Sequence, residues 1–107
     1  MTLNFAHDTT NVNGTETNLF ATIVENAKYT CTVFTSGMGA LDIYIFRRYV
    51  FDSDNNQLVL FDTITLDGVQ IPATLYFDEV TAQEFKITAQ KLTGTNRSFS
   101  WLNCYET

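Results

Sequence analysis

The sequence predicts an all-β protein, a single-domain antiparallel β-sandwich with about eight strands. The 107 residues provide enough chain for one hydrophobic core, so a single domain spans residues 1–107. Short runs rich in Val, Ile, Thr, Phe and Tyr alternate with clusters of turn formers such as NVNGTET, SGMGA and TGTN. That spacing of turn signals is typical of a sandwich or barrel. No stretch has sustained helical periodicity.

Eight runs between the turns are the predicted strands. Within the third run, Tyr29, Cys31 and Val33 alternate with polar residues, which predicts a strand with one face exposed to water. The seventh run alternates in the same way. The predicted ranges are 2–7, 18–24, 28–35, 40–51, 57–66, 69–76, 85–92 and 97–105.

Local features refine this arrangement. Arg47 and Arg48 interrupt both faces of the fourth run, so we expect a β-bulge there that restores an inward face on each side. Asp67-Gly68 lies between two β-branched segments and favours a two-residue type I′ hairpin, which would pair the fifth and sixth runs directly. Pro72 lies early in the sixth run, and a residue without an N–H predicts an edge strand.

The closing segment GTNRSFSWLNCYE combines large aromatic residues with an Arg at its start. Phe99 and Trp101 share a parity that predicts a core strand, because large aromatics dominate sandwich cores. The same parity carries Asn103 inward and places Leu102 and Cys104 on the opposite face. Either both faces are covered, or a bulge follows Trp101. Arg97, at the rim of this strand, is the first residue to test for partner binding.

Charge and targeting signals narrow the function classes. Six Lys and Arg against twelve Asp and Glu give a formal net charge of -6, which disfavours nucleic-acid binding. No apolar run reaches the ~18 residues that span a bilayer, and MTLNFAHDTT lacks the features of a signal peptide. We therefore expect a cytoplasmic product with no membrane partner, unless the protein is carried on a particle.

Cysteine and metal chemistry have weak signals. Cys31 and Cys104 lie in apolar alternating runs, so we expect two buried thiols, with a disulfide between them as the alternative. His7 is the only histidine, so a His-based metal cluster cannot form within one chain.

DSDNNQ has Asp and Asn at alternate positions, a spacing that suits a calcium ligand set. Gln57 and Thr63 stand where an EF-hand loop needs Gly and Glu, so a hairpin loop of turn formers is the preferred interpretation. We predict no cofactor and no metal.

Catalysis has no visible residue set, and the prediction is that the protein is not an enzyme. No nucleophile-elbow, phosphate-loop or zinc-protease motif is present. A glycosidase needs two carboxylates facing each other across a cleft, and a sequence alone cannot establish that. Asp62 shares the parity of Leu60 and Ile64, so it must be paired or mark a register change.

The aromatic content suggests a binding surface. Nine Phe, five Tyr and one Trp are more than a core of this size easily hides, so some should meet a sugar or a second protein subunit. Trp101, Tyr49 and Tyr105 motivate the alternative hypothesis of a carbohydrate-binding module. The predicted interaction surface comprises Arg47, Arg48, Tyr49, Arg97 and Tyr105.

The ending KLTGTNRSFSWLNCYE, on a small acidic all-β chain, resembles the accessory structural proteins of tailed bacteriophage virions, particularly head decoration or cement proteins. This resemblance implies a jelly-roll-like sandwich without catalytic residues that is located in the virion. It implies a decoration role in which the protein binds and stabilises the capsid exterior. The implied partners are the major capsid protein and further copies of itself, often as a trimer. Residues 1–17, polar and rich in Thr and Asn, would be an extended N-terminal arm.

Overall fold

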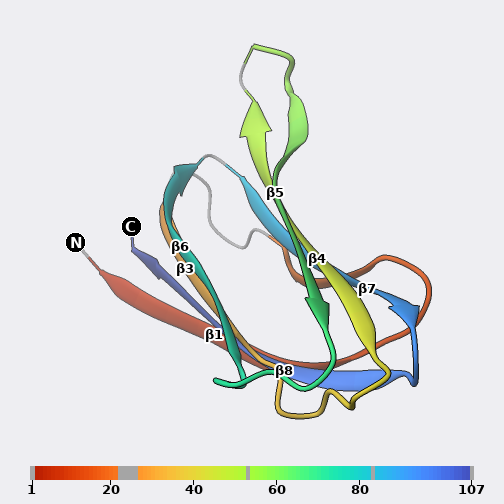
Figure 1. The fold of residues 1–107 in the computed structure, drawn as a ribbon. Coiled ribbons are helices and arrows are strands. Elements are labelled where there is room, and N and C mark those ends of the chain that lie inside the picture. The colour runs from red at the N-terminus through yellow and green to blue at the C-terminus, as the bar shows by residue number, and fades with distance from the viewer. Residues whose placement is uncertain (1, 22–26, 53, 83, 107) are drawn as a thin grey trace.

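Two four-stranded antiparallel sheets face each other in the computed structural model, which describes residues 2–21, 27–52, 54–82 and 84–106 (Figure 1). The first sheet has the order β1 (Leu3–Val12), β8 (Arg97–Glu106), β3 (Ala27–Phe34), β6 (Thr74–Ala82). The second sheet has the order β2 (Thr17–Ala21), β7 (Phe85–Thr93), β4 (Ile43–Asp52), β5 (Gln57–Asp67). Apart from the β4–β5 hairpin, each connection passes to the other sheet. The jelly-roll-like sandwich is therefore confirmed.

The core lies between the sheets and is built from alternating inward positions. Tyr29 of β3 stacks on Phe85 of β7 with ring centroids 4.9 Å apart. Phe99 of β8 meets Tyr44 and Phe46 of β4 in edge-to-face contacts with centroid distances of 4.9 and 5.4 Å. Both clusters join a strand of one sheet to a strand of the other, and aromatic area of this size dominates the stability of a small core. No helix in the described part of the chain is long and apolar enough to span a membrane.

The inward parity of the last strand is confirmed. Phe99, Trp101 and Asn103 are all buried, while Leu102 and Cys104 lie half-buried on the opposite face. No register shift interrupts the pairing of β8 with β1 or β3, so both of its faces are partly covered. Neither side-chain atom of Asn103 has a hydrogen-bond partner among the described residues. A buried amide in that state costs free energy.

A register shift lies beside the arginines as predicted, but the prediction that the fourth run carries the extra residue is wrong, because it lies on the neighbouring strand. Arg48 pairs with Asp62, and the next residue, Tyr49, pairs with Leu60. Phe61 is therefore the bulged residue, and β5 carries it. The shift changes which positions of β5 face inward, as one extra residue must in a strand of period two, whereas β4 alternates without interruption through the arginines.

The predicted hairpin at Asp67-Gly68 is wrong, because β5 and β6 belong to different sheets. Gly68 has a φ of 76°, and its N–H donates to the Asp42 carbonyl at 2.8 Å. At the other end of this loop, the Thr35 N–H donates to the Ala73 carbonyl at 2.9 Å. These bonds attach the β5–β6 loop to the β3–β4 loop and direct the chain into the first sheet.

Strand β6 consequently begins at Thr74, five residues later than predicted, and continues through Ala82. Pro72 precedes it in the loop. The edge position predicted from Pro72 is nevertheless confirmed, since β6 is the outer strand of the first sheet.

The chain start forms part of the first sheet. Leu3–Val12, which lies within the segment predicted as an extended arm, pairs with β8 along its whole length. The second strand, predicted over 18–24, is β2 up to Ala21, and residues 22–24 lie outside the described residues.

The two cysteines are free thiols on opposite faces of the first sheet. Thr30 pairs with Cys104 while Cys31 pairs with Asn103, so the two side chains point away from each other. The alternative of a disulfide between them is therefore wrong. Cys31 is buried as predicted, and burial raises the pKa of its thiol to about 12, whereas Cys104 is only partly buried.

Candidate interaction surfaces

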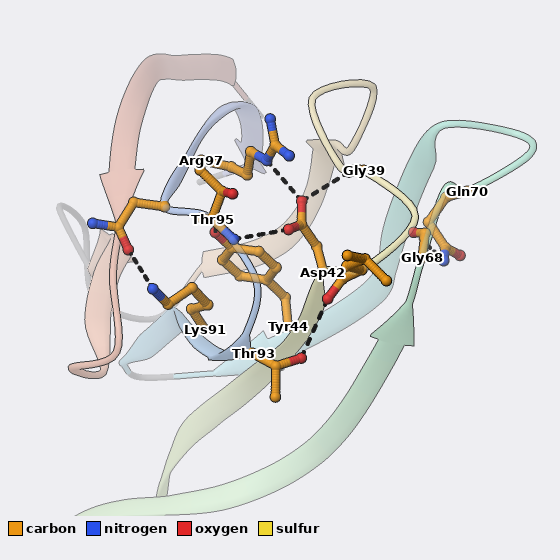
Figure 2. Close-up of polar contacts among 11 residues, drawn as sticks. Gly39, Asp42, Tyr44, Gly68, Gln70, Lys91, Thr93, Thr95 and Arg97 are labelled. Carbon is orange, nitrogen blue, oxygen red and sulfur yellow. Dashed lines mark hydrogen bonds and ion pairs between the residues drawn. The ribbon is translucent and has the colours of Figure 1, made fainter.

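Asp42, at the end of the β3–β4 loop, holds the loops at one end of the sandwich together (Figure 2). Only 1% of the residue is exposed. Its carboxylate accepts hydrogen bonds from the Gly39 N–H at 2.7 Å and the Thr95 N–H at 2.9 Å. The Arg97 Nε donates to it at 2.7 Å. The two backbone donors, assisted by the Arg97 guanidinium, lower the pKa of Asp42 to about 2.

Neighbouring contacts extend this network. The Tyr44 hydroxyl donates to the Thr95 carbonyl at 2.6 Å, and the Thr93 hydroxyl donates to the Leu41 carbonyl at 3.3 Å (Figure 2). Gly94 has a φ of 97°, and a Cβ on it would overlap the Asp42 carboxylate. Arg97, predicted as an interaction residue, is therefore fixed by Asp42, with 34% of its side chain exposed.

Arg48, also predicted to lie on the interaction surface, is an inter-sheet contact with 4% exposure. It extends from β4 in the second sheet to Asp78 on β6 in the first, where its Nη1 donates to the Asp78 carbonyl at 2.7 Å. Its Nη2 contacts the carboxylates of Asp62 and Asp78. Asp62 is thus paired and also lies at a register change, so both predicted explanations for it hold.

Two aromatic rings flank this guanidinium. The Arg48 Cζ lies 4.8 Å from the Phe61 ring centroid and 5.7 Å from that of Phe77. Its Nε has no hydrogen-bond partner among the described residues. Two carboxylates share one guanidinium nitrogen, so the Arg48 charge offsets one of their two charges and links the two strands, which favours a structural role for this cluster. The described residues contain no group of three or more His, Cys, Asp or Glu that could hold a metal ion.

Replacing Arg48 by Met is expected to leave the free energy of unfolding within about 1 kcal/mol of wild type. The substitution removes a buried charge with an unsatisfied Nε, while the side chains of Asp62 and Asp78, 38% and 80% exposed, can regain water. Chemical denaturation of both proteins measures the difference. A loss of more than about 3 kcal/mol would show instead that the ion pair is a net stabilising contact.

Arg47 and Tyr49 are brought together on the outer face of the second sheet by Glu16, which precedes β2. The Glu16 carboxylate accepts hydrogen bonds from the Tyr49 hydroxyl at 2.6 Å and the Thr88 hydroxyl at 2.5 Å. Arg47 Nη1 lies 3.6 Å from the same oxygen. These hydroxyl donors, Thr88 first, lower the pKa of Glu16. These polar groups contact one another, so the cluster links β4 and β7 to the residue that precedes β2.

Tyr105 lies apart from the other predicted interaction residues. Its ring packs at 6.2 Å from Tyr29, against the core. Trp101, one of the rings proposed to stack on a sugar, is 8% exposed and donates its indole N–H to the Thr10 hydroxyl at 3.2 Å. The five predicted residues therefore occupy four separate places, and Glu16 and Asp42, which fix three of them, have no distinguishing sequence signal.

Exposed apolar side chains fall into three patches in the described part of the chain. The sheet patch comprises Leu3, Phe5, Phe34 and Tyr76. The hairpin patch comprises Leu58 and Leu60, while Phe61, also exposed, lies against the Arg48 guanidinium. The loop patch comprises Leu41, Val69, Ile71 and Leu92. Isolated exposed hydrophobics are normal on a protein surface, but grouped ones mark contact sites.

The sheet patch lies on the outer face of the first sheet. Tyr76 lies opposite Thr32, which in turn pairs with Leu102, and Phe5 lies opposite Cys104. A hollow of about 460 Å³ opens beside Phe34, with the hydroxyls of Thr9 and Ser100 in its lining. Charged side chains gather at the end near the termini, where Lys28, Glu79 and Glu106 line a second, smaller hollow. His7 and Asp8 also line the hollow beside Phe34, so this part of the face combines apolar, hydroxyl and ionisable side chains.

The hairpin patch and the loop patch occupy opposite ends of the molecule. The β4–β5 hairpin extends beyond the rest of the sandwich (Figure 1). At the other end, Leu41 and Ile71 are 85% and 92% exposed on two loops that are hydrogen-bonded to each other. Both ends thus present apolar side chains to solvent.

Comparison with known proteins identifies a similar fold. No protein-family model matches the chain, and no curated protein matches its sequence. A solved structure of a Bacillus endospore appendage, described as belonging to a novel family of disulfide-linked pili, is similar with a TM-score of 0.63 and 12% sequence identity. The similarity covers 97% of this chain and 84% of that one. At this identity the two chains share a fold.

Proposed function

We propose that this protein is a non-enzymatic structural subunit that associates with further copies of itself. The observation that carries the proposal is the grouping of its exposed apolar side chains into three patches, which cover one sheet face and both ends. A monomer that functions alone rarely exposes contiguous apolar surface on several sides. A subunit with several neighbours needs such surfaces.

Two further observations support this role. The similar fold of the Bacillus appendage belongs to a protein that forms pili. Each sheet also ends in open edge strands, β1 and β6 in the first and β2 and β5 in the second, whose backbone groups are available for pairing with another chain. The 11-residue β5 is the longest of the four and carries the hairpin patch.

Sedimentation velocity over a range of protein concentrations tests the proposal. We expect species heavier than the 12.1 kDa chain, in proportions that rise with concentration and persist in reducing agent. Because apolar burial drives the contact, moderate salt should not dissolve the assembly. A single 12.1 kDa species at every concentration would contradict the proposal.

The narrower hypothesis, that this subunit decorates the exterior of a phage capsid as a trimer in the virion, forms part of the proposal and rests on the sequence resemblance. It predicts that the protein co-sediments with assembled capsids and that a trimer is the solution species. Co-sedimentation with capsids tests it. Self-association without capsid binding would remove the capsid role and leave the structural role intact.

Covalent linkage between copies is a specific expectation, motivated by the disulfide-linked neighbour. Cys104 is partly buried on the outer face of the first sheet, beside Phe5, whereas Cys31 is buried in the core. We predict that oxidised glutathione produces a disulfide-linked dimer on a non-reducing gel. Cys104→Ser should abolish that dimer, and the matched Cys31→Ser should retain it. A dimer that survives Cys104→Ser would refute the assignment.

Carbohydrate binding is the second candidate function, and one observation favours it. The hollow of about 460 Å³ beside Phe34 has an aromatic ring and hydroxyl groups in its lining, the groups that stack on and hydrogen-bond to a sugar. A glycan array with wild type and Phe34→Ala tests this role. A signal lost in Phe34→Ala would support it, and a silent array would remove it.

A further inference from the structure

We propose that copies of this chain associate head to tail, with the hairpin patch of one copy packed against the loop patch of the next. The inference rests on the proposed self-association and specifies which surfaces meet. It makes the contact heterologous, because two different surfaces pair at each junction. Repetition of such a contact gives an open chain of subunits, or a ring if the rotation closes.

Geometry prevents the two patches from meeting within one copy. Leu58 and Leu60 lie near the start of β5, and Val69 follows its end. At ~3.3 Å per residue, β5 places the patches roughly 30 Å apart. The longest extent of the molecule is 40 Å, so the patches lie toward its opposite ends. Within one copy, neither patch can therefore cover the other.

The loop patch is held in place before any partner arrives. Hydrogen bonds from Thr35 to Ala73 and from Gly68 to Asp42 join its two loops at both ends. Asp42 in turn binds Arg97 and the Thr95 N–H, which fixes the adjoining β7–β8 loop. Association with a fixed surface loses little conformational entropy, so more of the apolar contact energy becomes binding energy.

Charge disfavours the pairing of two hairpin ends. Asp52 ends β4 and Asp54 follows in the hairpin loop, and Glu84 lies beside them because its carbonyl accepts a hydrogen bond from the Phe51 N–H. Lys86, over the Tyr49 ring, is a nearby cation, so the formal charges of these four groups sum to -2.

The loop end is neutral by comparison. Arg97 and Lys91 lie there with Asp42 and Asp67, and the four charges cancel. Two hairpin ends brought together would therefore repel each other, whereas a hairpin end meets no net repulsion at a loop end. Like-charge repulsion of this kind selects partners and fixes orientation.

Two double variants, each removing one patch, test the inference under reducing conditions. Leu58→Asp with Leu60→Asp disables the hairpin patch, and Leu41→Asp with Ile71→Asp disables the loop patch. Thr63→Asp with Thr65→Asp adds the same charge to exposed positions of β5 outside both patches and serves as the matched control. Circular dichroism establishes that each variant is folded, and Ser replaces Asp at the same positions if any is not.

Sedimentation velocity gives distinct results for the alternatives. We expect each patch variant alone to associate roughly 100-fold more weakly than wild type, since a carboxylate would be buried in the contact. An equimolar mixture of the two should form a 1:1 dimer and nothing larger, because each supplies the intact patch that the other lacks. The control should assemble like wild type.

Three results would overturn the head-to-tail contact. If wild type assembles and both patch variants assemble equally well, the inference is wrong while the structural role stands. If each variant alone forms a dimer and the mixture gives no heterodimer, like patches pair with like. If wild type remains monomeric, both the inference and the proposed function fail.

Discussion

Asp42→Asn is expected to lower the free energy of unfolding by roughly 3 kcal/mol at neutral pH. The carboxylate accepts hydrogen bonds from two backbone N–H groups and from Arg97 in a site where the residue is 1% exposed. An amide at this position presents its own N–H₂ to some of those donors, so accepted bonds are lost and the donors are left unsatisfied. Chemical denaturation measures the change.

Asp67→Asn is the matched control for that substitution. Asp67 is exposed at the end of β5, near the same loops, and loses the same charge. Its change in unfolding free energy should stay below about 0.5 kcal/mol. Equal effects of the two substitutions would mean that general electrostatics, and not the local hydrogen bonds, determine the stability of this end.

The Asp42 contribution also has a defined pH dependence. The pKa of Asp42 is lowered to about 2 in the folded protein from 3.8, so the unfolded chain binds the proton more tightly. The stabilisation is therefore complete above the unfolded value and is lost as pH falls from about 4 toward 2. The difference in unfolding free energy between wild type and Asp42→Asn should shrink over that window. A difference that stays constant would contradict the assigned pKa.

Phe99→Ala is expected to destabilise the protein by about 3–5 kcal/mol. The ring is fully buried and contacts Tyr44 and Phe46 across the sandwich, so its removal leaves a cavity between the sheets. Phe34→Ala, on the outer face of the first sheet, is the control and should cost less than about 1 kcal/mol. Thermal unfolding of both variants provides the comparison. A small effect at Phe99 would mean that the inward parity of β8 is incorrect.

Alternation along single strands was sufficient to predict most of the fold. Tyr29, Cys31 and Val33 on β3, and Phe99 and Trp101 on β8, are buried as period two requires. The interruption by Arg47 and Arg48 predicted a register change at the right place but assigned the extra residue to the wrong strand, since β5 carries it. These signals are local, because they depend on which face of one strand meets the core.

Contacts between distant loops could not be predicted in that way. Asp67-Gly68 favours a hairpin by its local chemistry, but Gly68 donates to Asp42 from another loop and the chain changes sheet. The predicted range of the sixth strand was wrong as a consequence. Tertiary hydrogen bonds outweighed a two-residue propensity that amounts to a small free energy.

Candidate site residues were harder to predict than strands. Arg48 is charged and therefore suggested a surface, yet Asp62 and Asp78 draw it between the sheets. Arg97 suggested partner binding but is held by Asp42. Conversely, Leu and Ile are typical core residues, yet Leu41 and Ile71 are among the most exposed side chains. The patches depend on how loops meet in space, which a strand pattern does not encode.

The central claim is that the apolar patches at the two ends are surfaces buried by association with other copies. Hydrogen–deuterium exchange at low and high protein concentration tests it most directly. We expect backbone amides of Leu58 to Phe61 and of Gly68 to Ile71 to become protected as concentration rises, while the amides of β3 and β8, central in the first sheet, exchange equally slowly at both. Exchange that is independent of concentration in both end segments would contradict the claim.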